Sequence, residues 1–395
     1  MTPTERRASA SLAGIFALRM LGLFLVLPVF ALEARRYPGG EDPVMLGLAM
    51  GIYGLTQGLL QLPFGMASDR FGRKRVIVLG LVVFALGSFW AAAANDLSSL
   101  LVGRSLQGAG AVSAAVTALL ADLTRDEVRT KAMALVGGSI GLMFALSLVV
   151  SPLLTAWIGL SGLFWLTGVL ALLGVGVVIW GAPAAPEPEL GQHRGRLRDV
   201  LVNADLMRLN VGVFVLHAVQ LAMWVAVPAL LVQAGLQTAQ HWQVYLPAVL
   251  VSFLFLGVVF SLERRGHLKQ VFLLSIALIL VVEGGLFWQS MGTTHLGAMA
   301  ALLLLFFCGF NALEATQPSL ASRMAPRALR GTAMGVYNTL QSFGFFVGGL
   351  MGGWLVKSWG TPALFLCCAA ALLGWLLVAW PMQTPGRVAV AAPPA

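Results

Sequence analysis

The sequence predicts an all-α membrane protein with twelve transmembrane helices in two related six-helix bundles. Three observations predict this fold class. Hydrophobic residues make up 58% of the 395 positions and charged residues only 10%, whereas soluble domains carry about 25% charged residues. The chain divides into twelve apolar runs of about 20 residues, the length that crosses a bilayer as a helix. Finally, the second half of the chain repeats features of the first.

The first six apolar runs are expected to form an N-terminal bundle over residues 1–181. Short breaks that contain charged residues, Pro or Gly separate them. The runs cover 12–32, 44–66, 76–94, 97–120, 132–154 and 161–181. The polar segment before the first run has no small-residue cleavage site, so we expect the first helix to be retained.

The other six runs are expected to form a C-terminal bundle over residues 207–395, with no further soluble domain after it. These runs cover 208–232, 242–261, 269–289, 295–317, 331–355 and 361–381. Between the bundles, residues 182–206 are rich in Pro and in charge. Such a segment cannot lie in lipid, which predicts a cytoplasmic linker.

Lys and Arg are distributed unevenly between the two sides of the predicted bundle. With the N-terminus in the cytoplasm, twenty of the 25 lie in inner segments, and only Arg35, Arg36 and Lys357 lie in outer ones. The last two lie within helices. Positive residues are retained on the cytoplasmic side during insertion. We therefore expect a multi-pass protein of the bacterial inner membrane with both termini in the cytoplasm.

Two charged segments recur along the chain at similar offsets. The sequence of 69–72 recurs 194 residues later at 263–266, and that of 129–133 recurs 201 residues later at 330–334. These offsets predict duplication of a six-helix unit in parallel orientation. That arrangement is typical of secondary transporters, which bind substrate between the two halves.

A dense charged turn follows the second apolar run. It has the pattern Gly-x-x-x-Asp-Arg-x-Gly-Arg-Lys, formed by Gly65, Asp69, Arg70, Gly72, Arg73 and Lys74. This pattern resembles the signature loop between helices two and three of the major facilitator superfamily of transporters, and the resemblance extends over nearly the whole chain. It implies the major facilitator fold and a small-molecule substrate moved by alternating access.

The same resemblance implies a role for three of the charges near the loop. Asp69, Arg73 and Asp122 would form a charge relay between helices two and four that stabilises the outward-open state. Asp69 would face the start of the eleventh helix near Gly331, where backbone N–H groups attract an anion. The alternative is that these charges only fix topology, with the basic residues at the lipid headgroups.

Two further patterns bear on proton coupling. In the fourth helix, the positions Arg104, Gln107 and Gly108 resemble the Arg-x-x-Gln-Gly motif of proton-coupled members of the family. The fifth run has a Gly-rich stretch ahead of Pro152, as antiporters of the family do. It lacks the Gly that directly precedes the Pro in those proteins.

Glu314 is the predicted proton-binding residue. An ionisable side chain at a helix centre costs about 2.5 to 3.5 kcal/mol on insertion scales and is usually kept for function. Glu314 lies in the middle of the tenth run, with Asn311 one turn before it on the same face. The alternative is a protonated Glu in a static hydrogen bond between helices. For Glu283, in the ninth run, a structural role is expected.

Polar side chains on one face of an apolar helix line water or pack on a partner helix. By the family resemblance, helices one, four, seven and ten surround a central cavity, and packing remains the alternative for each residue. The cavity candidates are Arg19, Gln57, His217, Gln220, Trp224 and Asn311.

Other classes of function are not supported by the sequence. The net charge is +9, but the basic residues lie in separate short loops, which argues against nucleic-acid binding. No Gly-rich phosphate loop, metal-type spacing or catalytic constellation occurs, so we expect no enzyme, no metal and no cofactor. The proton gradient is the expected energy source.

The sequence therefore predicts a proton-coupled secondary transporter that works as a monomer and exports a small amphipathic compound in exchange for protons. The alternative is a proton symporter for a sugar or an organic acid, with a non-transporting scaffold as a third candidate. An apolar cavity with Glu314 as its acid favours export. A cavity lined by several charges favours symport.

Overall fold

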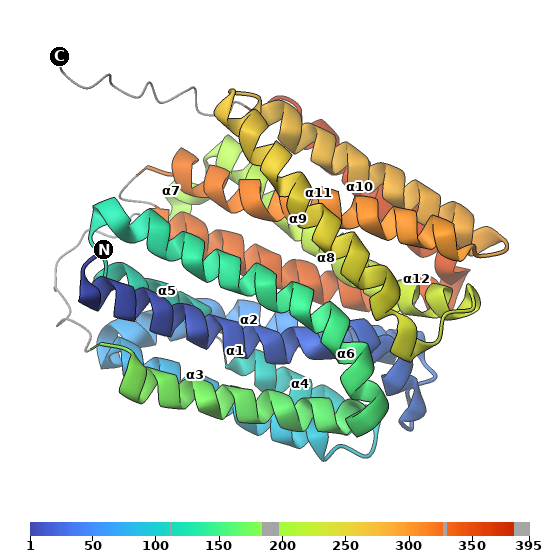
Figure 1. The fold of residues 1–395 in the computed structure, drawn as a ribbon, viewed down its shortest axis with the longest axis horizontal. Helices are drawn as coiled ribbons and strands as arrows, with labels where there is room; N and C mark the ends of the chain where they lie inside the picture. The colour runs from blue at the N-terminus through green and yellow to red at the C-terminus, as the bar shows by residue number, and fades with distance from the viewer. Residues whose placement is uncertain (111, 184–196, 327–329, 383–395) are drawn as a thin grey trace.

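Long helices run roughly along one direction and make up nearly all of the structure (Figure 1). It is a computed structural model that describes residues 1–110, 112–183, 197–326 and 330–382, among which no strand occurs. The helices are α1 (Pro3–Glu33), η1 (Ala34–Arg36), α2 (Pro43–Phe71), α3 (Arg73–Ala92), α4 (Leu97–Ala109), α5 (Ser113–Asp122), α6 (Asp126–Gly176), η2 (Val177–Gly181), α7 (Leu197–Leu201), α8 (Ala204–Gln233), η3 (Thr238–Gln240), α9 (Trp242–Arg264), α10 (Leu268–Met291), α11 (Leu296–Met324) and α12 (Arg330–Ala379).

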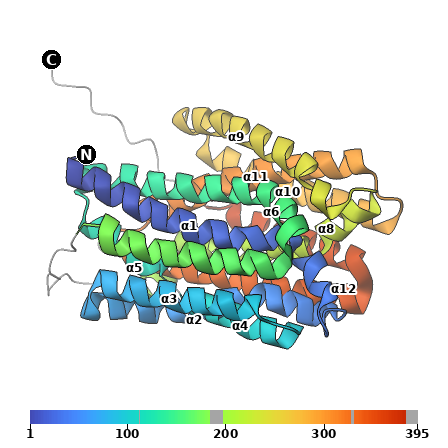
Figure 2. The same cartoon turned by 60° about the horizontal axis from the view of Figure 1, so that its bottom comes forward.

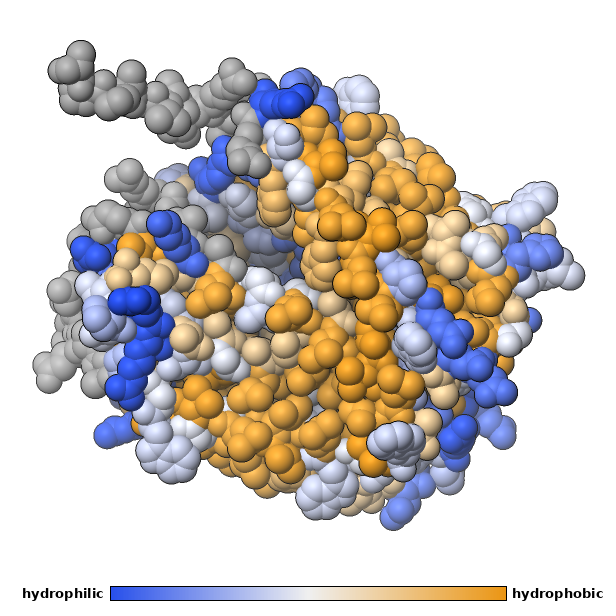
Figure 3. All heavy atoms as spheres, in the orientation of Figure 1, coloured by the Kyte–Doolittle hydropathy of each residue, from blue (hydrophilic) through white to orange (hydrophobic). Residues whose placement is uncertain are grey.

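The surface matches a protein that lies in lipid. Within the described residues, nine helices are long and apolar enough to cross a membrane. Figure 3 shows hydrophobic side chains over the middle of the molecule and hydrophilic ones gathered toward its two ends. Exposed residues of the middle include Leu142, Leu172, Leu254 and Leu274. Because soluble proteins rarely expose apolar surface on this scale, the prediction of an all-α, multi-pass membrane protein is confirmed.

The twelve predicted runs fall on these helices, with one difference in where helices break. The fourth run is divided between α4 and α5 around Gly110. Helix α6 carries the fifth and sixth runs and α12 the last two, and each is kinked at the predicted break, α6 at Gly159 and α12 at Gly360. Both glycines have positive φ, of 65° and 83°, a conformation that other residues rarely adopt. The predicted linker lies mostly outside the described residues, and its last part forms α7 and the start of α8.

The internal repeat is visible in the backbone. All positive-φ residues in the described part of the chain are glycines. They form three pairs at offsets of 196, 194 and 201 residues: Gly39 with Gly235, Gly72 with Gly266, and Gly159 with Gly360. The first pair follows the first helix of each half, the second lies in the charged turns, and the third divides the last two runs. The two halves therefore turn in the same way at matching places.

Long helix pairs pack within each half and between the halves. Helix α1 lies along α6 in the first half, α8 lies along α12 in the second, and α2 lies along α12 between the halves (Figures 1 and 2). Glycines permit the contact of α2 with α12, because a Cβ on Gly51 would lie 2.7 Å from the carbonyl oxygen of Phe346. A Cβ on Gly47 would lie even closer to the carbonyl oxygen of Gly349. Small residues at such positions let helix backbones approach within lipid.

The two ends of the bundle are packed differently. We call the end where α1 starts and α2 ends the N-terminal end, and the opposite one the far end. One hydrophobic cluster joins both halves, and from the first half it takes only far-end segments, within 26–34, 46–50, 91–100 and 144–164. At the N-terminal end each half has its own cluster. The Gly-rich stretch of α6 there has no atom within 4 Å of where a Cβ would lie on Gly137, Gly138 or Gly141. The halves are thus joined mainly at the far end.

An ion pair links the halves at the far end. Nζ of Lys357, in α12, lies 2.8 Å from Oδ2 of Asp42. Asp42 is also the N-cap of α2, where its Oδ1 accepts from the backbone N–H of Val44 at 2.9 Å. The ammonium of Lys357 and that N–H lower the pKa of Asp42 below its ordinary value. Because the two side chains remain 53% and 36% exposed, we expect the pair to contribute about 0.2 to 1 kcal/mol.

We expect Asp42→Asn to remove this contribution while it keeps the helix cap, since asparagine is an equally good N-cap. A double-mutant cycle with Lys357→Gln isolates the interaction of the pair. Once Asp42→Asn is present, Lys357→Gln should cost no further free energy of unfolding. The pKa of Asp42 is lower in the folded state than its ordinary value of 3.8. The pair therefore stabilises the folded state fully above pH 3.8, and this contribution is lost as the pH falls through the lowered pKa of the folded state. Thermal unfolding in lipid nanodiscs at neutral and acidic pH measures this. Additive single-mutant effects at neutral pH would contradict it.

Candidate functional site

The charged turn joins α2, α3 and α5 at the N-terminal end. Gly72 makes the turn with φ of 93°. Arg73 is ion-paired with Asp69, and its Nε lies 2.9 Å from Oδ2 of Asp122. Its Nη1 also donates to Oγ of Ser68 at 2.8 Å. The structure thus brings together the three charges of the predicted relay.

The other residues of the turn, Lys74, Arg70 and Gly65, each contact a neighbouring segment or ring. Lys74 donates to the carbonyl oxygen of Ala182 at 2.5 Å, and the guanidinium of Arg70 lies 5.4 Å from the ring centre of Phe71. Gly65 faces Ala114 of α5. The expected approach of Asp69 to the region of Gly331 lies at the edge of the segment outside the described residues. The latch role therefore stays a prediction.

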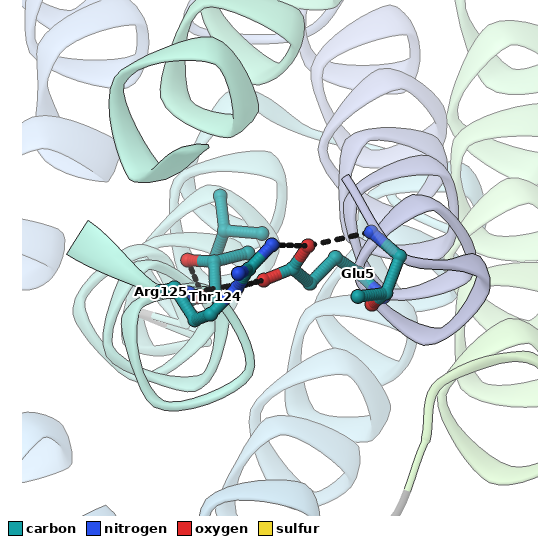
Figure 4. A network of polar contacts seen from close by, with 5 residues as sticks. Glu5, Thr124 and Arg125 are labelled. Atoms are coloured by element: carbon teal, nitrogen blue, oxygen red, sulfur yellow. Dashed lines mark hydrogen bonds and ion pairs between the residues drawn. The ribbon is translucent and has the colours of Figure 1, made fainter. Parts of the chain in front are cut away.

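A second charge pair at this end was not anticipated as a site. The carboxylate of Glu5 accepts from Nε of Arg125 at 2.8 Å, from Nη2 at 3.3 Å and from the backbone N–H of Thr2 at 2.7 Å. Figure 4 shows this network next to Thr124. It holds the start of α1 against the segment that leads into α6. The only sequence signal was an acid in the first turn of a helix, which is common.

Arg19 is the centre of a polar network inside the first half. Its side chain is 1% exposed. Nη2 donates to the hydroxyl of Tyr53 at 2.6 Å and to Oε1 of Gln57 at 2.8 Å, and Nη1 donates to Oγ of Ser113 at 3.1 Å. Gln57 in turn donates to Oγ of Ser342 in α12 at 2.9 Å. The network therefore runs from α1 through α2 to the second half of the chain.

Arg104 lies on the other side of Tyr53, with its guanidinium 5.3 Å from the ring centre. Nη1 donates to Oε1 of Gln107 at 2.8 Å, and two longer contacts of 3.4 Å reach the carbonyl oxygens of Ala49 and Met50. Gln107 donates onward to Ser88 of α3 at 2.8 Å. The motif of the fourth helix thus forms a buried polar cluster between α2, α3 and α4.

His217 and Glu314 meet in the second half. Nε2 of His217 lies 3.2 Å from Oε1 of Glu314 and 2.7 Å from the side-chain nitrogen of Gln341. Nδ1 lies 2.8 Å from the carbonyl oxygen of Val213, which only accepts, so Nδ1 bears the hydrogen. In neutral histidine Nε2 then presents a lone pair, toward which the side-chain nitrogen of Gln341 donates. Oε1 of Glu314 lies next to this lone pair.

A small cavity lies between the halves, close to both networks. Its walls are mainly apolar. They are formed by Leu23, Phe24, Leu27, Met50, Tyr53, Arg104, Leu221 and Phe345. Phe345 also packs edge-on against the ring of His217, with centroids 4.8 Å apart. The cavity therefore touches Arg104 on one side and, through Phe345, the His217–Glu314 pair on the other.

The remaining predicted cavity residues lie deeper in the second half. Asn311 donates to Oγ of Ser252 in α9 at 2.8 Å. Gln220 is 3% exposed, and Trp224 is fully buried with its ring against Tyr245. None of the three lines the cavity described above. Their predicted part in substrate binding is not tested by these contacts.

Gln341 and Ser342 take part in these contacts but were not among the site residues predicted from the sequence. Both lie in the apolar run 331–355, near Asn338 on the same face. The rule that singled out His217 and Gln220, polar side chains at helical spacing in an apolar run, would have found them there as well.

We expect Gly108→Ala to disturb this site. A Cβ on Gly108 would collide with the carbonyl oxygen of Tyr53 and with Oγ1 of Thr56, so α4 would have to move away from α2 and carry Arg104 with it. Overpacking of this kind costs about 1 to 3 kcal/mol. The matched control is Gly14→Ala, because Gly14 has nothing within 4 Å. Unfolding midpoints in nanodiscs should fall for the first variant only. Equal midpoints for both would contradict the close contact.

Comparison with known proteins agrees with this architecture. The Major Facilitator Superfamily matches residues 12–349. The chain is 42% identical to the inner membrane transport protein YajR of Escherichia coli, over 98% of this chain and 86% of that protein. It is 27% identical to the multidrug resistance protein MdtH of Yersinia enterocolitica, over 85% and 83%. The crystal structure of a D-xylose-proton symporter superposes with a TM-score of 0.75 at 15% identity, over 96% and 98%. This chain therefore belongs to the major facilitator superfamily of membrane transporters.

Proposed function

We propose that this transporter is a proton-coupled exporter of a small amphipathic compound in the bacterial inner membrane. The observation that carries the proposal is the His217–Glu314 pair, with 3.2 Å between Nε2 and Oε1. An imidazole and a carboxyl group in contact inside the membrane form a natural site for a transported proton. His217 is 2% exposed and Glu314 33% exposed, so the carboxyl is the member that water reaches.

The packing of the two ends supports alternating access. The halves share a core at the far end and have separate cores at the N-terminal end. In the proposed orientation the N-terminal end faces the cytoplasm, both termini included, and the partly exposed Glu314 releases its proton there. Rocking of the halves about the central cavity would then expose the pair to the opposite side.

Phe345 supplies the coupling between substrate and proton. It lines the cavity and packs on the ring of His217. A compound that enters the cavity displaces this ring and so changes the distance between His217 and Glu314. Substrate and proton would then compete without touching each other.

Export is favoured because most of the cavity wall is apolar. The distant relative MdtH carries the name of a multidrug resistance protein. The second candidate is symport of an organic acid with protons, which one observation favours, namely Arg104 in the cavity wall. In both cases we propose a monomer that uses the proton gradient and no cofactor.

We expect Glu314→Gln to abolish substrate-driven proton movement. Glutamine keeps the size of the side chain and cannot release a proton at Glu314. In everted vesicles with an acidified lumen, a compound exported by the wild type should cause proton release from the lumen, reported by a pH-sensitive dye. The matched control is Glu283→Gln, since Glu283 is also an acid in a helix of the second half, but neither of its carboxyl oxygens has a hydrogen-bond partner in the described structure.

An unchanged proton signal in Glu314→Gln would sink the proposed proton site. Proton uptake into the lumen on adding the compound would favour symport over export.

A further inference from the structure

We infer that the compound held in the cavity carries a negative charge, which Arg104 binds directly and Arg19 stabilises from behind Tyr53. This inference rests on the proposed function, because it takes the cavity to be the transport site. It goes further by naming the substrate class, an apolar body with one anionic group. Both guanidinium groups are held by neutral partners.

Arg104 has only neutral partners. Its side chain is 5% exposed and lines the cavity. One hydrogen bond of 2.8 Å reaches Gln107, and the two contacts with carbonyl oxygens of α2 are both 3.4 Å long. A guanidinium has five N–H donors in a planar fork, suited to two oxygens of a carboxylate or similar group. Donor capacity is therefore left for a ligand on the cavity side.

Arg19 is also held by neutral groups. Its partners are two hydroxyls and one amide oxygen, from Tyr53, Ser113 and Gln57. Its Nε has no hydrogen-bond partner in the described structure. Tyr53 contacts both cations, since its hydroxyl accepts from Arg19 and its ring lies under the guanidinium of Arg104. Two positive charges thus contact one cavity-lining side chain.

No carboxylate neutralises either cation in the part of the chain that the structure describes. The acids that form ion pairs there have other partners, and Glu314, the acid of the central pair, contacts His217. The acid–partner pairs are Glu5–Arg125, Glu33–Arg36, Asp42–Lys357, Asp69–Arg73, Asp122–Arg73, Asp205–Arg208, Glu263–Arg323 and Glu314–His217. Buried charge without a counter-ion is unfavourable, and inside a membrane it is kept for function. A bound anion supplies the missing counter-ion.

The rest of the wall defines the body of the ligand. Apart from Arg104 and Tyr53 it consists of aliphatic and aromatic side chains. Such a wall offers no hydrogen-bond partners for a sugar and no second cation for a dianion. An apolar wall with one cation suits a small arylalkyl carboxylate. An organic cation would be repelled by both guanidinium groups.

The test compares three compounds that share one body and differ in their head group: 4-phenylbutyrate, 4-phenylbutanamide and 4-phenylbutylamine. Binding to the full-length protein in nanodiscs is measured with radiolabelled acid, with the other two as competitors. We expect the acid to bind roughly tenfold to a hundredfold more tightly than the amide, as hydrogen bonds to a charged group predict. The amine should not compete.

Variants then locate the site. Arg104→Gln should weaken binding of the acid by roughly tenfold or more and leave binding of the amide unchanged, while Arg104→Lys keeps part of the preference. Arg35→Gln is the matched control, since Arg35 is exposed at the far end and carries the same charge. The comparison of head groups on the wild type needs no variant, so it stands even where Arg104→Gln fails to fold.

The inference is overturned if the amide or amine binds as tightly as the acid, if none of the three binds, or if Arg104→Gln keeps full affinity for the acid. Its failure is distinguishable from failure of the proposed function. Proton release from everted vesicles driven by the amine and not by the acid would support proton-coupled export and overturn the anionic substrate. Tight binding of the acid without any proton movement would support the anion site and contradict the coupling.

Discussion

The cost of burying charge inside an apolar helix bundle is the constraint on which the centre of this protein depends. A buried ion loses several kcal/mol of hydration, and each one here must recover it from groups on other helices. Arg19 does so through Tyr53 and Gln57 of α2 and Ser113 of α5. Since Gln57 continues to Ser342 of α12, the partners of one cation hold four helices in register across the two halves.

Close backbone contact between α2 and α12 allows that network to cross from one half to the other. The contact needs glycine, because a Cβ at Gly51 or Gly54 would run into the carbonyl oxygens of Phe346 or Ser342. At Gly335, nearer the N-terminal end, the closest atom lies 4.0 Å from a built Cβ. The interface is therefore tightest from the middle toward the far end. Motion that opens the far end must separate these glycines, whereas the glycines described nearer the N-terminal end, such as Gly335, make no such contact.

Local patterns in the sequence were sufficient for much of this fold. Run length and composition predicted the helices, and the resemblance of the charged turn to the signature loop of the major facilitator superfamily predicted the meeting of Asp69, Arg73 and Asp122. The contact of His217 with Gln341 could not be predicted, since it joins residues 124 positions apart and depends on how α8 packs on α12. The break at Gly110 depends equally on tertiary contacts, because a Cβ there would lie 2.5 Å from the carbonyl oxygen of Gly80 in α3.

The two halves share a backbone plan and differ in the charges that they hold. Gly72 and Gly266 turn the chain in the same way, yet the buried cations of the centre, Arg19 and Arg104, belong to the first half, whereas His217 and Glu314 belong to the second. Duplication alone would place similar groups in both. The separation puts the proposed anion site at Arg104 in the first half and the proposed proton site at His217 and Glu314 in the second, with Phe345 in contact with both the cavity and His217. In the proposed mechanism, movement of one half against the other would change the distance between these two sites, and so give a physical basis for exchange of substrate and proton.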